Sequence, residues 1–217
     1  KPVHLNFHGS GFIFPSLGSN HLACTLLARQ TGAIVLDCDY RKGPKKNEEG
    51  RFDGRVTVSG FSAGGTLALA LVGNLEEGVQ VQGVTVFYPP VDCSVPFRKK
   101  VPPPPGPGGP NPIGDLELMR LAYLGDWNEL RDPRLSPAFC EPGKFPDKGR
   151  TLLLSVEQDW LDAECRAFGE RLDEAGRGVV RIWEKGVGHG FDVFCSEGTG
   201  EAERRDRVYR EMVLCVK

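Results

Sequence analysis

One segment, residues 56–71 (VTVSGFSAGGTLALAL), constrains the fold of this chain more than any other. Its β-branched residues at 56–58 predict a short buried strand, and residues 66–72 predict an apolar helix. Between them lies GFSAG, and a strand, a G-x-S-x-G turn and a helix in this order are typical of a nucleophile elbow. Glycine is expected at positions 60 and 64, because a side chain there would collide with the neighbouring strand or helix.

The elbow predicts that Ser62 occupies a strained conformation at the positive end of the following helix. There its hydroxyl would stand clear of the backbone. From this segment alone, a glycine-rich turn with an incidental serine remains the alternative.

Composition narrows the class of protein. A chain of 217 residues with 40% hydrophobic residues fits one α/β domain with a real core. The net charge of −2 gives no electrostatic footprint for nucleic acid, so we expect no nucleic-acid partner. No apolar run reaches the roughly 18 to 20 residues of a membrane span. Because Lys1 leads straight into a strand pattern, we also expect no signal peptide.

The chain has seven cysteines and no C-x-x-C pair. Neither a zinc site nor a redox motif is therefore supported. An odd number of scattered cysteines, several of them inside apolar segments, favours reduced thiols in a cytoplasmic protein.

Further apolar runs predict a mostly parallel sheet with helices on both faces. The expected strands are residues 3–7, 33–38, 83–88, 151–156 and 179–183, and the expected helices are 17–30, 116–124, 163–175 and 200–216. We expect Gly32 to cap the first helix and Asp162 to be the N-cap of the helix at 163–175. Apolar side chains expected on the inner helix faces are Leu22, Leu26, Leu27, Leu118, Leu121, Ala122, Val208, Met212 and Leu214.

Two segments depart from this alternating pattern. Residues 40–55 contain almost no apolar side chains, although a crossover between parallel strands usually carries a helix with an apolar stripe. We therefore expect that residues belonging near 45–53 are missing from the sequence. Residues 92–111 are too rich in proline and glycine for regular structure. Together with the helix at 116–124, residues 93–130 predict a cap-like or lid-like insertion, with a flexible surface excursion as the alternative.

Candidate catalytic side chains follow three of the predicted strands. Ser62 lies in the elbow, Asp159 lies just past residues 151–156, and His189 follows residues 179–183. In open α/β sheets, functional groups collect beyond the carboxyl ends of the strands. The chain order Ser, Asp, His is that of α/β-hydrolase enzymes. The glycine-rich loop at 8–12 follows the first strand and can turn backbone N–H groups toward a developing oxyanion.

Six motifs carry a resemblance to a known family. HGSGF at 8–12 resembles HGGGF, DCDYRKGP at 37–44 resembles V-D-Y-R-L-A-P, and GFSAGG at 60–65 resembles G-D-S-A-G-G. DPRLSPAF at 132–139, QDWLDAE at 158–164 and GHGF at 188–191 follow in the family's order. The chain thus resembles the hormone-sensitive-lipase-type α/β-hydrolases, which include arylacetamide deacetylases and microbial carboxylesterases. The resemblance implies one α/β-hydrolase domain over residues 1–217, with the family's N-terminal cap and first strands absent.

The resemblance further implies a serine carboxylesterase that hydrolyses short-to-medium acyl esters with a Ser62, His189 and Asp159 triad. Backbone N–H groups of Ser10, Gly11 and Ala63 would hold the oxyanion. Ser10 stands where the family has glycine, which requires a φ angle open to a residue with a Cβ. The implied partner is a small acyl ester, no metal or organic cofactor is needed, and homodimers through the edge strand or closing helix are expected.

Two alternatives stay open at this point. One is a non-catalytic ligand-binding relative, as in the gibberellin receptors, which resemble the family but lack the catalytic histidine. His189 argues against that interpretation. The other is an amidase or transacylase on the same scaffold.

Overall fold

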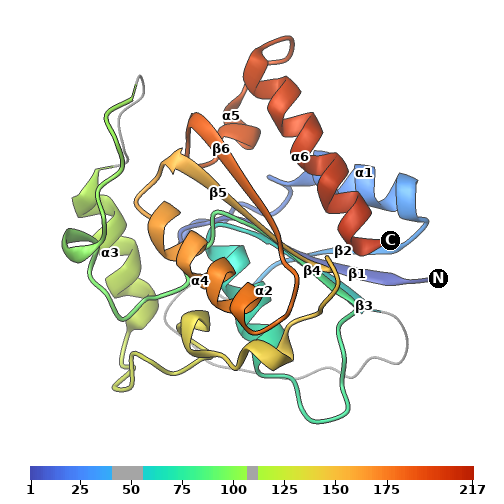
Figure 1. The fold of residues 1–217 in the computed structure, drawn as a ribbon. Helices are drawn as coiled ribbons and strands as arrows, with labels where there is room; N and C mark the ends of the chain where they lie inside the picture. Colours follow the sequence, from blue (N-terminus) through green and yellow to red (C-terminus); the bar gives the residue numbers. More distant parts are fainter. Residues whose placement is uncertain (41–55, 107–111) are drawn as a thin grey trace.

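A computed structural model describes residues 1–40, 56–106 and 112–217 of the chain. Within these residues, six strands form one parallel sheet in the order β2-β1-β3-β4-β5-β6 (Figure 1). The strands are β1 (Val3–Phe7), β2 (Ile34–Cys38), β3 (Val56–Phe61), β4 (Gly83–Phe87), β5 (Thr151–Gln158) and β6 (Val180–Gly188). The helices are α1 (His21–Thr31), α2 (Ala63–Gly73), α3 (Ile113–Leu124), α4 (Asp162–Glu174), α5 (Phe191–Phe194) and α6 (Gly200–Val216), with short 3-10 turns at Phe97–Lys99, Pro137–Phe139 and Pro142–Lys144.

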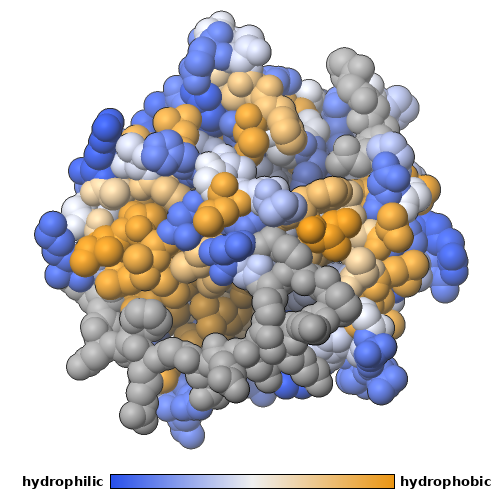
Figure 2. Space-filling model, turned by 180° about the vertical axis from the view of Figure 1, so that it is seen from behind, coloured by the Kyte–Doolittle hydropathy of each residue, from blue (hydrophilic) through white to orange (hydrophobic). Residues whose placement is uncertain are grey.

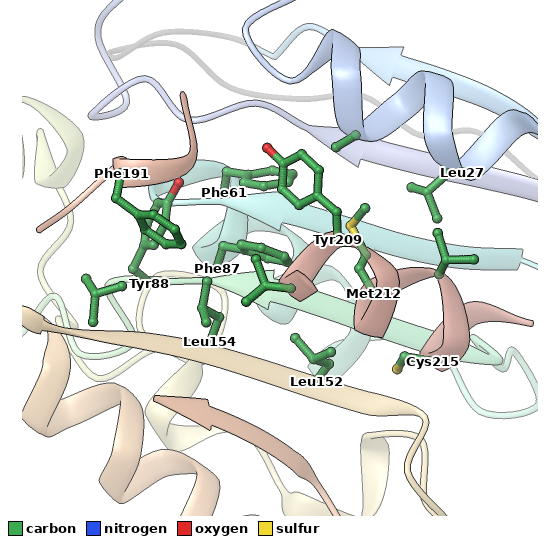
Figure 3. Close-up of a cluster of buried hydrophobic side chains, with 14 of the residues drawn as sticks. Leu27, Phe61, Phe87, Tyr88, Leu152, Leu154, Phe191, Tyr209, Met212 and Cys215 are labelled. Carbon is green, nitrogen blue, oxygen red and sulfur yellow. The ribbon is translucent and has the colours of Figure 1, made fainter. Parts of the chain in front are cut away.

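Helices cover both faces of the sheet, as predicted. Helices α1 and α6 share one buried cluster with the strands, and α2 and α4 share the other. Figure 3 shows the first cluster, in which Tyr209 and Met212 of α6 pack over Phe61 of β3 and Phe87 of β4. The rings of Phe61 and Phe87 lie 4.6 Å apart between centroids. Burying each of these large side chains contributes roughly 1.5–3 kcal/mol.

The parallel register brings the carboxyl ends of the strands to one edge. Phe7 at the end of β1 pairs with Gly60, and Phe61 at the end of β3 pairs with Phe87. Phe87 pairs in turn with Leu154 of β5. Every loop that leaves this edge therefore starts close to its neighbours, which is the condition for a shared site.

Several sequence-based predictions need correction. Helix α1 begins at His21 rather than near residue 17, because Gly18 lies in the preceding turn with φ +88°, a conformation that a right-handed helix cannot include. Strand β2 is not fully buried: it is an edge strand of the described sheet, and Ile34 is 50% exposed. The 3-10 turn at Phe97–Lys99 interrupts the proline-rich segment that was expected to be irregular. Gly32, by contrast, is confirmed as the left-handed cap of α1.

The predicted helix faces are partly wrong. Leu27, Val208 and Met212 are buried as expected. Side chains predicted to be buried but exposed are Leu22, Leu118, Leu121 and Leu214. Helices α1 and α3 carry leucine on more than one side, so the leucine positions alone do not identify their packed faces. In α6, Val213 and Cys215 are buried on either side of Leu214 in the sequence, while Leu214 itself points to solvent.

Asp162 is not an N-cap. It lies inside the first turn of α4, and Leu161 takes the cap position. The carboxylate of Asp159 instead accepts a hydrogen bond from the Leu161 N–H, at 3.1 Å. The start of α4 is therefore tied to Asp159, the residue expected to orient His189.

All seven cysteines are unpaired thiols, as the sequence predicts.

No helix in the described parts of the chain is long and apolar enough to cross a membrane. The prediction that residues are missing near 45–53 lies outside the described residues. Seen from behind, hydrophobic residues form patches between hydrophilic ones (Figure 2).

The two clusters predict where truncation destabilises the fold. Leu154 is fully buried in β5, whereas Leu214 of α6 is 62% exposed. We expect Leu154→Ala to lower the free energy of unfolding by about 3 kcal/mol, because it removes buried contacts and leaves a cavity. The matched control Leu214→Ala should change it by less than about 0.5 kcal/mol. Urea denaturation measures both, and equal effects would contradict the assignment of the core.

Candidate active site

The turn between β3 and α2 has the geometry of a nucleophile elbow. Ser62 has φ +51° and ψ −123°, a strained backbone conformation for a residue with a Cβ, and α2 begins at the next residue. A Cβ on Gly60 would lie 2.2 Å from the Gly64 carbonyl oxygen, and one on Gly64 would lie 2.1 Å from the Phe7 carbonyl oxygen. Both contacts are with backbone, so neither position accepts a side chain. The predicted glycine requirement is confirmed.

Three side chains predicted from separate motifs meet at this turn. His189 Nε2 lies 2.8 Å from Ser62 Oγ, and His189 Nδ1 lies 2.6 Å from Asp159 Oδ2. The imidazole thus bridges a hydroxyl and a carboxylate, each by a different ring nitrogen. A hydroxyl in this arrangement can give up its proton to the imidazole as it attacks an electrophile.

Asp159 is held in place from its other oxygen. Its Oδ1 accepts from the Leu161 N–H while its Oδ2 faces His189, and the side chain is buried. This two-sided hold fixes the carboxylate in the direction of the imidazole. Burial by itself lowers the pKa of His189, but the nearby charges of Asp159 and Asp192 raise it, and the net pKa lies above its ordinary value.

A chain of hydrogen bonds shapes the glycine-rich loop at residues 8–12. Phe12 N–H donates to Ser10 Oγ (3.1 Å), Ser10 Oγ lies 2.6 Å from the Tyr40 hydroxyl, and that hydroxyl donates to the His8 carbonyl (2.5 Å). Tyr40 also stacks on the His8 ring, with 4.7 Å between centroids. The loop is therefore fixed by side chains as well as by its glycines.

Residues of this loop line the same cavity as Ser62. Ser10 is not among the residues with positive φ, so its Cβ costs no backbone strain. Gly11 has φ +53°, and a Cβ there would lie 2.5 Å from Met119 Sδ. Ala63, the third residue expected at the oxyanion, is the first residue of α2, directly after Ser62.

The cavity in front of Ser62 has a volume of about 500 Å³ and a mostly apolar wall. Described residues between positions 93 and 120 supply part of that wall; that residues 93–130 form a cap-like or lid-like insertion stays a prediction. Apolar side chains that line it include Phe12, Phe97, Leu116, Met119, Leu161 and Val193. Among the residues that the structure describes, no cluster of three or more His, Cys, Asp and Glu side chains could hold a metal ion.

Three residues near the site were missed by sequence reasoning. Tyr40 braces the loop at residues 8–12, although the sequence marks it only as part of the DCDYRKGP motif. The Tyr88 ring lies against the His189 ring, with 4.5 Å between centroids, and the Tyr88 hydroxyl donates to Asp192 (2.5 Å). The available signals were a tyrosine directly after a predicted strand and an acidic residue three positions after His189.

Comparison with known proteins supports the same family. A family model described as alpha/beta hydrolase fold matches residues 4–53 and 45–193. Carboxylic ester hydrolase LipN of Mycobacterium tuberculosis is 25% identical over 93% of this chain and 60% of its own length. Tuliposide A-converting enzyme 1 of Tulipa gesneriana is 26% identical over 88% of this chain and 56% of its own length. The chain thus spans a little over half the length of these relatives.

Solved structures share the fold. Carboxyl esterase 2 from the mycorrhizal fungus Tuber melanosporum superposes with a TM-score of 0.79 at 22% identity, covering 100% of this chain and 78% of that one. An esterase of Pyrobaculum calidifontis gives a TM-score of 0.78 at 23% identity, covering 99% and 75%. The motifs, the sheet and the family match agree, and the chain belongs to the hormone-sensitive-lipase-type family of α/β-hydrolases.

Proposed function

We propose that this protein is a serine carboxylesterase. The observation that carries the proposal is the His189 imidazole bridging Ser62 Oγ at 2.8 Å and Asp159 Oδ2 at 2.6 Å. The family membership and the esterase names of several relatives support the same activity. A ligand-binding relative without catalysis would have no need for an intact, hydrogen-bonded triad on a strained elbow.

In the proposed mechanism, hydrolysis proceeds in two acyl-transfer steps. His189 Nε2 takes the proton of Ser62 as Oγ attacks the ester carbonyl, and Asp159 stabilises the imidazolium that forms. His189 then donates that proton to the leaving alcohol, which departs and leaves an acyl-enzyme on Ser62. Water, deprotonated by the same imidazole, attacks the acyl group. The bond to Ser62 Oγ then breaks, Oγ takes the proton back from His189, and the carboxylic acid leaves.

Backbone N–H groups of Ser10, Gly11 and Ala63 are proposed to stabilise the tetrahedral oxyanion. The position of Ser10 and Gly11 in the cavity wall, and of Ala63 directly after the nucleophile, supports this role. The dipole of α2 adds partial positive charge at the same end. Preorganised donors of this kind need no rearrangement during the reaction.

The substrate is proposed to be a small ester with a short-to-medium acyl group. A largely apolar cavity of about 500 Å³ falls within the usual size range of small-molecule sites. Residues 93–130 are proposed to act as a lid-like insertion that excludes water from this cavity. Cytoplasmic location and homodimer formation stay predictions of the sequence.

Replacing the nucleophile tests the proposal. Ser62→Ala should lower kcat for p-nitrophenyl butyrate by at least about 10⁴-fold, because among the described residues no other hydroxyl is hydrogen-bonded to His189. Ser19→Ala is the matched control, since Ser19 lines the cavity and, among the described residues, takes no part in the hydrogen bonds that join Ser62, His189 and Asp159. Unchanged turnover by Ser62→Ala, with its fold intact by circular dichroism, would refute the assignment. Running the matched butyramide in parallel separates esterase from amidase activity.

The pH profile tests the role of His189. Protonated imidazole cannot accept the Ser62 proton, so kcat/KM should fall as the pH drops through the pKa of His189. Because that pKa is raised above 6.5, we expect the midpoint of the acid limb above pH 6.5. Asp159→Asn removes the anion that raises it, so the midpoint should move to lower pH while kcat drops about 10⁴-fold. A wild-type midpoint at or below 6.5 would contradict this electrostatic account.

The oxyanion loop can be tested with two glycines that both have positive φ. Gly11→Ala places a Cβ against Met119, whereas a Cβ on Gly18 meets nothing within 4 Å. We expect Gly11→Ala to lower kcat about 100-fold by displacing a donor. Gly18→Ala should cost stability but keep kcat within about twofold of wild type. Equal losses of kcat in the two variants would argue against an oxyanion role for Gly11.

A further inference from the structure

A second hydrogen-bonded carboxylate lies beside the triad. Asp192 is 3% exposed and belongs to α5, which begins two residues after His189. One of its oxygens accepts from the Tyr88 hydroxyl at 2.5 Å, and the other accepts from the Tyr209 hydroxyl at 2.8 Å. A buried carboxylate is costly unless its oxygens are paired, so the two phenols make this placement tolerable.

Tyr88 connects that carboxylate to the imidazole. It follows β4 directly, with φ +41°, an uncommon conformation for a residue with a Cβ. Its ring lies 4.5 Å from the His189 ring between centroids, at 56° between planes, while its hydroxyl reaches Asp192. Strained backbone of this kind concentrates at active sites. Figure 3 shows Tyr88 and Tyr209 in one buried cluster, on opposite sides of Phe61 and Phe87 in this view.

The two hydrogen bonds of His189 do not by themselves hold the ring tightly. They run through the two nitrogens, and the ring is tethered through Cγ to Cβ, but hydrogen bonds tolerate some bending, so the ring keeps a small range of orientations. A packing contact against the ring narrows that range. The Tyr88 ring makes such a contact, and Asp192 holds Tyr88.

On the basis of the proposed function, we propose that Tyr88 and Asp192 are positioning residues for His189, which set the tilt of its imidazole toward Ser62. Tyr209 pairs with the other oxygen of Asp192 and makes no ring contact with His189 among the aromatic pairs of the described residues. Both tyrosines donate a hydrogen bond to Asp192, but only Tyr88 of the two also packs against the His189 ring. Comparing them therefore separates positioning of the imidazole from hydrogen bonding to the buried carboxylate.

Charge gives an independent readout of the same contact. The imidazole is faced by Asp159 from the end of β5, by Asp192 from α5 and by the phenol of Tyr88 from the end of β4. Asp192 is faced by Tyr88, by Tyr209 and by the imidazole, and Arg205 and Cys195 lie near Tyr209. The negative charge of Asp192 raises the pKa of His189, so neutralising it lowers that pKa.

Two tyrosine variants separate positioning from mere packing. Tyr88→Phe and Tyr209→Phe each remove one phenol hydroxyl from the same carboxylate and keep the ring. We expect Tyr88→Phe to lower kcat for p-nitrophenyl butyrate about tenfold with KM unchanged, because a misplaced general base slows only the chemical step. Tyr209→Phe should leave kcat within about twofold of wild type. Equal kcat values in the two variants would overturn the proposal.

A titration without substrate makes the test independent of turnover. The pKa of His189, followed by NMR in the isotope-labelled chain, should be lower in Asp192→Asn than in wild type. An unchanged pKa of His189 would overturn the link between Asp192 and His189. If Tyr88→Phe fails to fold, this titration of Asp192→Asn alone tests the proposal. Failure of the proposed function would show up separately, as hydrolysis that survives Ser62→Ala.

Discussion

The site depends on one steric constraint, the close approach of the elbow to strand β1. Gly64 lies so near the Phe7 carbonyl that even a methyl group would overlap it, and Gly60 lies equally near Gly64. This crowding forces Ser62 into its strained conformation and places it beside the loop at 8–12, which leaves β1 at the same point. Ser62 and the loop at 8–12, the proposed nucleophile and oxyanion loop, are therefore brought together by backbone contact in the middle of the sheet. The cost of the strain is covered by the buried clusters on both faces.

Two carboxylates, Asp159 and Asp192, set the charge around the His189 imidazole. Asp159 is held by a backbone N–H, and Asp192 is paired with the Tyr88 phenol whose ring packs against His189. Together they offset the burial that would otherwise favour the neutral ring. A base with a raised pKa is a stronger proton acceptor, provided that the pH keeps it unprotonated. The proposed catalysis thus depends on two residues outside the triad, Tyr88 and Asp192.

Much of this arrangement could be predicted from the sequence. Apolar runs mark the strands, and in a parallel sheet the residues after each run must meet at one edge, which placed Ser62, Asp159 and His189 together. The missed features depend on packing. Leu118 lies on a helix with leucine on several sides, and Leu214 is exposed between the buried Val213 and Cys215. Asp162 has a residue type that is common at helix caps, but the hydrogen bond from the Leu161 N–H to Asp159 starts α4 one residue earlier. Tyr88 and Asp192 are 104 residues apart, and no local pattern pairs them.

The most direct test of the account is a crystal structure of the protein after reaction with an alkyl fluorophosphonate. The account predicts one covalent adduct, on Ser62 Oγ, with the phosphoryl oxygen within hydrogen-bond distance of the N–H groups of Ser10, Gly11 and Ala63. His189 would then lie between the adduct and Asp159, with the alkyl chain in the apolar cavity. An adduct on another residue, or a phosphoryl oxygen pointing away from the loop at 8–12, would contradict it.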